Sequence, residues 1–167
     1  MENKVFIGLG SNIGNRLNQI RRAARLLNEC GECIVESTSS VYESKPISGG
    51  NQDNYYNAVV LIRTFLLPEK LIKLTQFIER FLGRKATEIK WAPREIDIDI
   101  LFYNQLIYNK DDLIIPHPEI LNRDFVLVPL KEITDDLVHP VLNKKISGMD
   151  FSGIEKNIIC KFDYPII

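Results

Sequence analysis

The chain has few cysteines, almost no net charge and no long apolar run. Three cysteines are too few, and odd in number, for a disulfide scaffold, so a reducing compartment is expected. With 21 Lys+Arg against 22 Asp+Glu the net charge is −1, which provides no general field that attracts nucleic acid. No apolar run approaches the roughly 18 residues that a membrane span needs. These absences favour a cytoplasmic protein that binds neither membranes nor nucleic acids.

Length and composition match an ordinary folded domain. A domain typically has about 150 residues, so we expect residues 1–167 to form a single one. Hydrophobic residues make up 45% and charged residues 26% of the chain, a mixture that excludes intrinsic disorder. A chain of this length buries roughly 70% of its unfolded surface, so its core needs no disulfide or metal for stability.

Cys30 and Cys33 form a C-x-x-C pair, a spacing found in redox sites and in half of a zinc site. A redox pair normally lies at a helix N-terminus, where the dipole lowers the thiol pKa, whereas this pair follows a helical pattern. Only Cys160 remains as a further cysteine, so four-ligand zinc would require distant histidines. We interpret the pair as two incidental cysteines at a turn from helix to strand.

The hydrophobic pattern predicts an α+β fold. Apolar runs rich in β-branched residues predict strands, and apolar residues three and four apart predict helices. The expected order is strand, helix, strand, strand, helix, strand, over residues 5–9, 17–30, 33–42, 56–65, 66–82 and 95–103. Beyond these we expect a hairpin partner at an extended sheet edge over 106–115 and a short helix over 122–133. This order resembles the split βαβ arrangement of ferredoxin-like domains, an α/β sandwich in which helices pack on an antiparallel sheet.

Two aspartates fall within the strand expected over 95–103. Side chains alternate across a strand, so Asp97 and Asp99 share one face and the isoleucines around them share the other. Aspartate is rare in strands, and two on one face repel each other unless a positive charge lies between them. The pattern fits either a half-exposed strand with a hydrated acidic face or a Mg²⁺ site whose remaining ligands come from phosphates.

A cationic loop precedes the two aspartates and favours the magnesium interpretation. The loop contains Arg84, Lys85, Lys90 and Arg94, with Trp91 among them. A polyphosphate requires such a combination, because Mg²⁺ bridges some of its oxygens and arginines clamp others. A tryptophan within a polar loop suggests that the indole stacks on a ligand.

Other candidates are less specific. The stretch Gly8–Gly14 fails the dinucleotide fingerprint, because Ile13 stands where G-x-G-x-x-G needs glycine, and the chain has no Walker motif. Asn57 offers both a donor and an acceptor, so it could recognise the edge of a heterocycle or cap a strand end. His117 and Arg123 are candidate ligands for phosphate, although such residues are also common as structural hydrogen-bond partners.

Five sequence blocks occur in order along the chain: Gly10-Ser11-Asn12, Tyr55-x-Asn57, Gly83-Arg84, Trp91-Ala92-Pro93-Arg94-x-Ile96-Asp97-Ile98-Asp99-Ile100, and Pro116-His117-Pro118 with Arg123-x-Phe125-x-Leu127-x-Pro129-Leu130. Together they closely resemble the 6-hydroxymethyl-7,8-dihydropterin pyrophosphokinases of folate biosynthesis. The resemblance covers nearly the whole chain, and its tryptophan-to-aspartate block is highly specific. It implies a ferredoxin-like α/β fold and transfer of the β,γ-pyrophosphate of ATP to the pterin hydroxymethyl oxygen, with release of AMP.

The same resemblance implies roles for individual residues. Asp97 and Asp99 would hold two Mg²⁺ ions, and Arg84, Arg94 and His117 would complete the catalytic set. The implied ATP contacts are Gln76, Glu79, Arg84, Trp91, Arg94, Ile100, His117 and Arg123. The implied pterin contacts are Ser44, Ile47, Tyr55, Asn57, Trp91 and Phe125. The partners would be these two small molecules, on a monomer or weak homodimer.

The sequence departs from the family pattern at two positions, and two alternative functions stay open. A second loop arginine of the family falls on Ala86, and a basic residue before the histidine falls on Asp112. A different magnesium-dependent nucleotidyltransferase would release pyrophosphate instead of AMP. A non-catalytic ferredoxin-like module that binds a ligand would need neither the paired acids nor the cationic loop.

Overall fold

The computed structural model describes residues 2–47, 52–85, 92–110 and 113–167. Its main sheet has six strands in the order β10-β3-β4-β1-β5, with β2 also paired to β4. All its pairs are antiparallel, and its strands are β1 (Asn3–Ser11), β2 (Cys33–Thr38), β3 (Val41–Ser44), β4 (Tyr55–Thr64), β5 (Asp97–Tyr103) and β10 (Ile158–Phe162). The predicted antiparallel α+β fold is confirmed.

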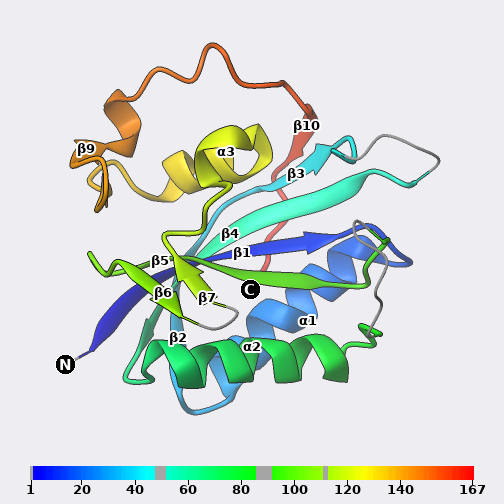
Figure 1. Ribbon diagram of the computed structural model, residues 1–167. Coiled ribbons are helices and arrows are strands. Elements are labelled where there is room, and N and C mark those ends of the chain that lie inside the picture. Colours follow the sequence, from blue (N-terminus) through cyan, green and yellow to red (C-terminus); the bar gives the residue numbers. More distant parts are fainter. Residues whose placement is uncertain (1, 48–51, 86–91, 111–112) are drawn as a thin grey trace.

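Among the described residues, three α-helices cover the two faces of this sheet (Figure 1). One face carries α1 (Arg16–Glu29) and α2 (Pro68–Phe81), and the other carries α3 (Asp124–Ile133). In α1 the Asn15 side chain caps the helix by accepting the Asn18 N–H at 3.1 Å, and α2 begins with proline in its first turn. The predicted helices therefore begin and end close to where their sequence signals lie.

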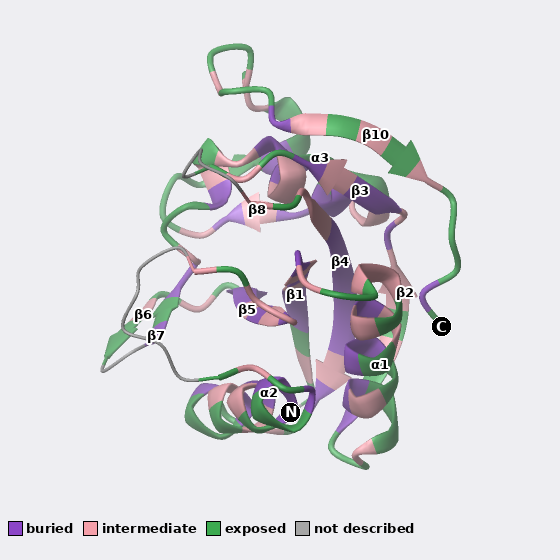
Figure 2. Ribbon diagram, turned by 90° about the vertical axis from the view of Figure 1, so that its right-hand side faces the viewer, coloured by how far each residue is buried: buried purple, intermediate pink, exposed green. Residues whose placement is uncertain are grey.

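Each face of the sheet has its own hydrophobic core. Under α1 and α2 lie alternate residues of the central strands, including Val5, Ile7 and Ile62, while Phe6 and Leu61 face α3. Figure 2 shows this burial along β4, which lies between the two cores. Because successive strand residues point to opposite faces, a strand in this position needs the almost continuous apolar sequence that β4 has.

The strand predicted over 33–42 is broken into β2 and β3. Thr38 pairs with Val60 but Tyr42 pairs with Asn57, so this segment has one residue more than β4 opposite it. Ser39 lies at the break, where its hydroxyl accepts the Val59 N–H at 2.9 Å in place of a main-chain carbonyl. A serine side chain thus interrupts the ladder that the β-branched sequence predicted.

The prediction of an additional edge strand over 106–115 is wrong. Within the described residues, β6 (Tyr108–Lys110) and β7 (Leu113–Ile115) pair only with each other. The outer edge of β5 is occupied by other groups: the Leu101 carbonyl accepts the His117 N–H at 3.0 Å, and the Ile98 N–H donates to the Glu79 carboxylate at 2.8 Å. These two partners take edge positions that pairing with the hairpin would need.

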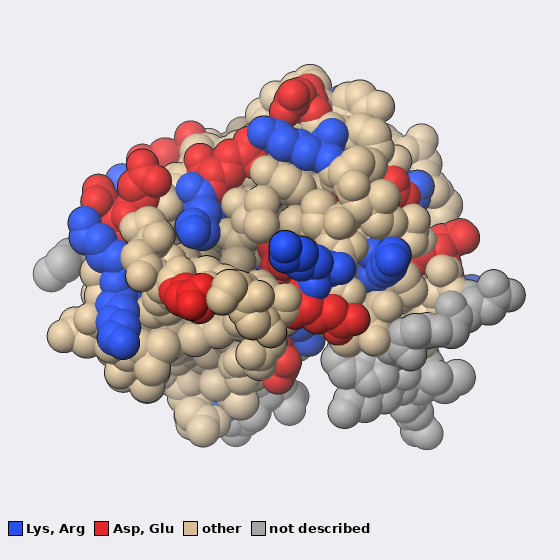
Figure 3. All heavy atoms as spheres, turned by 90° about the horizontal axis from the view of Figure 1, so that it is seen from above, with Lys and Arg blue, Asp and Glu red and all other residues tan. Residues whose placement is uncertain are grey.

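The C-terminal third contains further elements. They are the 3-10 turns Ile120–Asn122 and Ile146–Gly148, the small hairpin of β8 (Val138–His139) and β9 (Lys144–Lys145), and β10, which adds an edge strand beside β3. Cys30, Cys33 and Cys160 carry free thiols. No helix of the described residues is long and apolar enough to cross a membrane. Figure 3 shows basic and acidic side chains interspersed on the face seen from above.

Candidate active site

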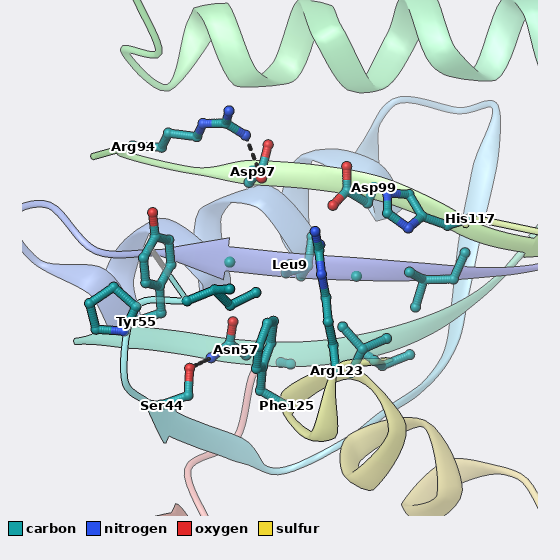
Figure 4. Close-up of a pocket in the computed structure, with 18 of the residues that line it drawn as sticks. Leu9, Ser44, Tyr55, Asn57, Arg94, Asp97, Asp99, His117, Arg123 and Phe125 are labelled. Atoms are coloured by element: carbon teal, nitrogen blue, oxygen red, sulfur yellow. Dashed lines mark hydrogen bonds and ion pairs between the residues drawn. The ribbon is translucent and has the colours of Figure 1, made fainter. Parts of the chain in front are cut away.

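A pocket of about 310 Å³ lies on the α3 side of the sheet (Figure 4). Its walls come from segments far apart in the sequence, which the antiparallel sheet brings together. The lining residues are Gly8, Leu9 and Gly10 of β1, Ser44, Lys45, Pro46, Ile47, Tyr55, Asn57, Ala58 and Val59 around β3 and β4, Arg94, Asp97, Asp99, Leu101 and His117 around β5, and Arg123, Phe125 and Val126 at the start of α3.

Two glycines leave the strand face beneath the pocket bare. Gly8 and Gly10 are two residues apart in β1, so they share the face that carries no side chain. A Cβ added to Gly10 would lie 3.6 Å from Asn57 Oδ1 and 3.9 Å from Asp97 Cβ, within the volume that is now open. Sequence analysis missed this role, although two glycines two apart in an apolar strand are its signal.

The two aspartates point from β5 into the pocket, as strand alternation predicted (Figure 4). Asp97 is held between two arginines: its Oδ1 accepts Arg84 Nη1 and its Oδ2 accepts Arg94 Nη1, both at 2.7 Å. The positive charge that two such aspartates require is therefore supplied on one side by the cationic loop.

Asp99 has a different environment from Asp97. Burial raises the pKa of Asp99 to about 7, the negative charge of Asp97 acts in the same direction, and the positive charge of Arg123 opposes both. A buried carboxyl beside another carboxylate is an environment that a cation would stabilise. Two hard oxygen donors on one strand face fit a divalent metal whose other ligands are phosphate oxygens and water. The described residues contain no cluster of three or more His, Cys, Asp or Glu side chains suited to hold a metal without such help.

Glu79 supports the arginine side of the site from α2. Its side chain is 6% exposed, and one carboxylate oxygen accepts both the Ile98 N–H and Arg84 Nη1. Burial is the main cause that raises the pKa of Glu79, and Arg84 partly offsets it. The geometry makes Glu79 a support for Arg84 and β5, outside the pocket lining.

His117 and Arg123 line the wall near Asp99. His117 Nδ1 accepts the Glu119 N–H at 3.2 Å, which leaves Nε2 as the ring nitrogen that carries the proton. Burial and the nearby Arg123 guanidinium lower the pKa of His117, so the ring is a neutral donor near pH 7. Arg123 extends from the start of α3 toward β1 (Figure 4).

The opposite end of the pocket is less charged. Asn57 is 7% exposed, and its amide nitrogen donates to Ser44 Oγ at 2.9 Å, so its carbonyl oxygen is turned toward the pocket. Tyr55 and Phe125 flank this oxygen (Figure 4). Ile47 lies at the rim, 43% exposed.

Asn12 connects three segments around the site and was not predicted to do so. Its side-chain oxygen accepts the Arg94 N–H at 2.7 Å, and its amide nitrogen donates to Gln52 Oε1 at 3.3 Å and to the Asp53 carbonyl at 3.4 Å. The side chain is 2% exposed. A second anchor is Arg16, whose Nη1 lies 3.1 Å from Glu43 Oε1 and 2.7 Å from the Asn54 carbonyl.

Four predicted site residues among the described ones do not line the pocket: Gln76, Glu79, Arg84 and Ile100. Arg84 contacts the pocket through Asp97, and Glu79 binds Arg84. Gln76 is half-buried on α2, and Ile100 is 3% exposed in the core on the opposite face of β5. Trp91 lies outside the described residues, as do Ala86 and Asp112.

Residues 6–135 match the family profile described as 7,8-dihydro-6-hydroxymethylpterin-pyrophosphokinase. The chain belongs to this family. Membership accounts for the order of the five sequence blocks, which lie within the matched residues. It does not by itself assign a role to any one side chain.

Two of three similar curated relatives are named as pyrophosphokinases, and the third as a folic acid synthesis protein. The pyrophosphokinase of Aquifex aeolicus is 42% identical over 156 residues, which cover 93% of this chain and 96% of that protein. The one of Bacillus subtilis is 44% identical over 133 residues, or 80% of this chain and 79% of that protein. The folic acid synthesis protein fol1 of Pneumocystis carinii is 47% identical over 144 residues, 86% of this chain but only 19% of that longer protein.

Solved structures share the fold. A crystal structure of HPPK-DHPS in complex with substrates has a TM-score of 0.68 at 17% identity and covers 87% of this chain and 42% of that one. A structure of wild-type Plasmodium falciparum HPPK-DHPS with pteroate has a TM-score of 0.71 at 18% identity, covering 87% of this chain and 41% of that one. This chain thus spans less than half of those two chains of known structure.

Proposed function

We propose that the chain transfers the β,γ-pyrophosphate of ATP to the hydroxymethyl oxygen of 6-hydroxymethyl-7,8-dihydropterin, giving AMP and the pterin diphosphate in tetrahydrofolate biosynthesis. Family membership supports the reaction class. The single observation that carries the proposal is the pocket itself. In it, Asp97 and Asp99 lie beside the bare strand face of β1, between a cationic wall and the less charged end that Tyr55 and Phe125 flank.

The pterin occupies the end of the pocket near β4. The flat ring lies over Gly8 and Gly10, with Tyr55 and Phe125 on either side. Asn57 Oδ1 accepts an N–H of the ring, because the amide nitrogen already donates to Ser44. Ile47 closes the rim. The resemblance adds Trp91, which lies outside the described residues, to the proposed contacts.

The triphosphate of ATP lies along β5, where Arg84, Arg94, His117 and Arg123 donate to its oxygens. Glu79 keeps Arg84 in place, and Gln76 is an ATP contact from α2. Ile100 contributes through its main chain, since its side chain is buried. Alternate residues of a strand direct their main-chain groups to the same edge, so the Ile100 N–H shares the outer edge with the Ile98 N–H that meets Glu79.

Two Mg²⁺ ions fit the donor set of Asp97 and Asp99. When bound, Mg²⁺ neutralises phosphate oxygens and stabilises charge that develops between the β-phosphorus and the leaving AMP. The carboxylates hold the cations, and Arg84 and Arg94 exchange Asp97 for phosphate oxygens when the nucleotide arrives.

The side chains then act mainly by position and charge. The hydroxymethyl oxygen attacks the β-phosphorus in line with the bridging oxygen to the α-phosphate, and that bridging oxygen leaves with AMP. Arg84 and Arg94 stabilise the negative charge that develops during transfer. Neutral His117 donates from Nε2 to a phosphate oxygen. The proton of the attacking hydroxyl group passes to solvent, and the proposal assigns no described side chain as a general base.

Phosphorus NMR of ATP with the dihydropterin substrate and Mg²⁺ tests the proposal. AMP together with a pterin diphosphate is the expected outcome, and Asp97→Ala is the matched inactive control. Pyrophosphate together with an adenylylated pterin would instead identify a nucleotidyltransferase. Binding of both ligands without turnover would identify a ligand-binding module. The cytoplasmic location and the monomeric or weakly dimeric state stay predictions, which fractionation and light scattering check.

A further inference from the structure

The C-terminal segment around residues 157–158 is joined to the pocket wall by the carboxylate of Asp124. Asp124, the first residue of α3, is 6% exposed, and its Oδ2 accepts the main-chain N–H groups of Asn157 at 2.7 Å and Ile158 at 2.9 Å. Residues 157 and 158 lie beyond the family match at 6–135. The contact therefore joins the matched residues to a part of the chain outside the match.

Asp124 stands between two residues of the pocket wall. Arg123 and Phe125 both line the cavity, and Asp124 Oδ1 accepts the Phe125 N–H at 2.8 Å. The two oxygens of this carboxylate thus accept three N–H groups. A buried carboxylate needs such hydrogen bonds to offset the loss of its contacts with water. Because the side chain is fixed from both sides, the direction in which the chain enters α3 is fixed as well.

The same C-terminal segment contacts the facing wall. The Asn157 carbonyl accepts the Lys45 N–H at 3.0 Å, and Ile158 pairs with Ser44 in the β10–β3 ladder. Ser44 and Lys45 both line the pocket. Figure 1 shows β10 beside β3, on the α3 side of the molecule. One short stretch of chain therefore spans from the wall that carries Phe125 to the wall that carries Ser44.

We propose that Asp124 is a positioning residue for the pterin end of the pocket. By holding residues 157–158 it sets the separation between the start of α3 and the end of β3, and thereby the width of the slot between Phe125 and Asn57. The inference rests on the proposed function, since it names the pterin as the ligand whose binding this width controls.

Glu132 provides a matched control at the other end of α3. Its Oε1 accepts Ser40 Oγ at 2.7 Å and lies 3.3 Å from Lys161 Nζ of β10, so it also ties the C-terminal segment to the domain. Glu132 and its partners do not line the pocket. A residue that only fastens the segment should behave like Glu132, whereas a positioning residue should not.

The test compares Asp124→Ala, Asp124→Asn and Glu132→Ala by calorimetry. Each variant is titrated with a non-hydrolysable ATP analogue and Mg²⁺, and then with the dihydropterin. Asp124→Ala should raise the dissociation constant of the pterin about tenfold or more, since hydrogen bonds to a charged group are lost, and that of the ATP analogue by less than about threefold. Asp124→Asn should fall between Asp124→Ala and the wild type, because the amide oxygen can still accept the N–H groups of residues 157 and 158 whereas the amide nitrogen cannot accept the Phe125 N–H. Glu132→Ala should lower the melting temperature and leave the affinity for the pterin unchanged.

Equal pterin affinity in Asp124→Ala and Glu132→Ala would overturn the inference, and so would equal loss of affinity for both ligands in Asp124→Ala. If Asp124→Ala does not fold, Asp124→Ser replaces it, since the shorter hydroxyl cannot reach the N–H groups of both Asn157 and Ile158. The same two outcomes would then overturn the inference. If the wild-type protein does not bind the pterin, the proposed function is refuted. The wild-type titration therefore distinguishes failure of the proposed function from failure of the inference about Asp124.

Discussion

Asp97 and Arg94 form an ion pair across three residues of sequence, with Arg94 Nη1 2.7 Å from Asp97 Oδ2. In the proposal, the Asp97 carboxylate binds Mg²⁺ and the Arg94 guanidinium binds phosphate. In this structure the guanidinium therefore lies where Mg²⁺ would bind, and the carboxylate lies where phosphate would bind. Arg84 does the same at Asp97 Oδ1. The arriving MgATP brings both a cation for the carboxylate and an anion for the arginines, so the exchange keeps every charge paired.

The two aspartates should respond in opposite directions to substitution in the metal-free protein. Asp97→Asn removes the charge that pairs with Arg84 and Arg94, so we expect the free energy of unfolding to fall by about 1–3 kcal/mol. Asp99→Asn removes a carboxylate whose ionisation burial opposes, so we expect the protein to become more stable at pH 8. Thermal unfolding with a chelator present measures both.

The sign of the Asp99 effect can be checked by pH. The folded state raises this pKa above its unfolded value, so the group favours folding when it is protonated, and that contribution is lost as the pH rises through about 7. The advantage of Asp99→Asn should therefore be larger at pH 8 than at pH 5. Both variants should lose turnover. If either variant keeps Mg²⁺-dependent activity near the wild-type level, the aspartate that it replaces is not a metal ligand.

Arg84→Ala and Arg94→Ala should lower kcat by about 10²–10³-fold, the range seen when a donor to transition-state charge is removed. Arg80, exposed in the last turn of α2, supplies the control, and Arg80→Ala should leave kcat unchanged. Steady-state kinetics with both substrates varied gives the comparison. A rise in the KM for ATP at unchanged kcat would mean that the two arginines only anchor the ground state.

The parts of the fold with strong local periodicity could be predicted from sequence. The apolar positions of α1 and α2 and the alternation of Asp97 and Asp99 gave both the helices and the shared face of the aspartates, because those signals depend only on near neighbours. A positive partner for Asp97 could be anticipated, but the distances depend on where the fold places Arg84 and Arg94 relative to β5.

What sequence could not predict depends on contacts between distant residues. The short strand β10 has a weak pattern of its own and exists through its pairing with β3. The roles of Asn12 and Asp124 consist of hydrogen bonds to main-chain groups of remote segments, which no local spacing encodes. Ser39 breaks a strand because of a hydroxyl group that β-propensity ignores.

Glu132 should contribute stability that acid removes. Burial alone would raise the pKa of Glu132, but hydrogen bonds from Ser40 and Tyr42 outweigh it and hold the pKa below its ordinary value. A depressed folded pKa stabilises the protein above the unfolded pKa near 4.5, and this contribution is lost as the pH falls through the folded value.

Chemical denaturation of the wild type and Glu132→Gln at several pH values tests this. The difference in unfolding free energy should be about 1 kcal/mol at pH 6, limited by solvent screening at this surface site, and should shrink toward pH 3. Glu29→Gln, at an exposed position of α1, should give no such change. A difference that is constant with pH would mean that packing, and not charge, accounts for the effect.

Gly10→Ala should separate substrate binding from folding. Gly10 lies in the extended strand β1, and the added Cβ would meet its nearest atoms at 3.6–3.9 Å, which is ordinary contact, so the melting temperature should not fall. The methyl group nevertheless occupies the strand face on which the proposal lays the pterin, beside the carbonyl oxygen of Asn57. We expect the KM for the pterin, measured at saturating MgATP, to rise about tenfold, which corresponds to about 1.4 kcal/mol. Gly153→Ala, where no atom lies within 4 Å of the new Cβ, is the matched control and should change neither quantity. An unchanged KM for the pterin in Gly10→Ala would mean that the ring does not lie on β1.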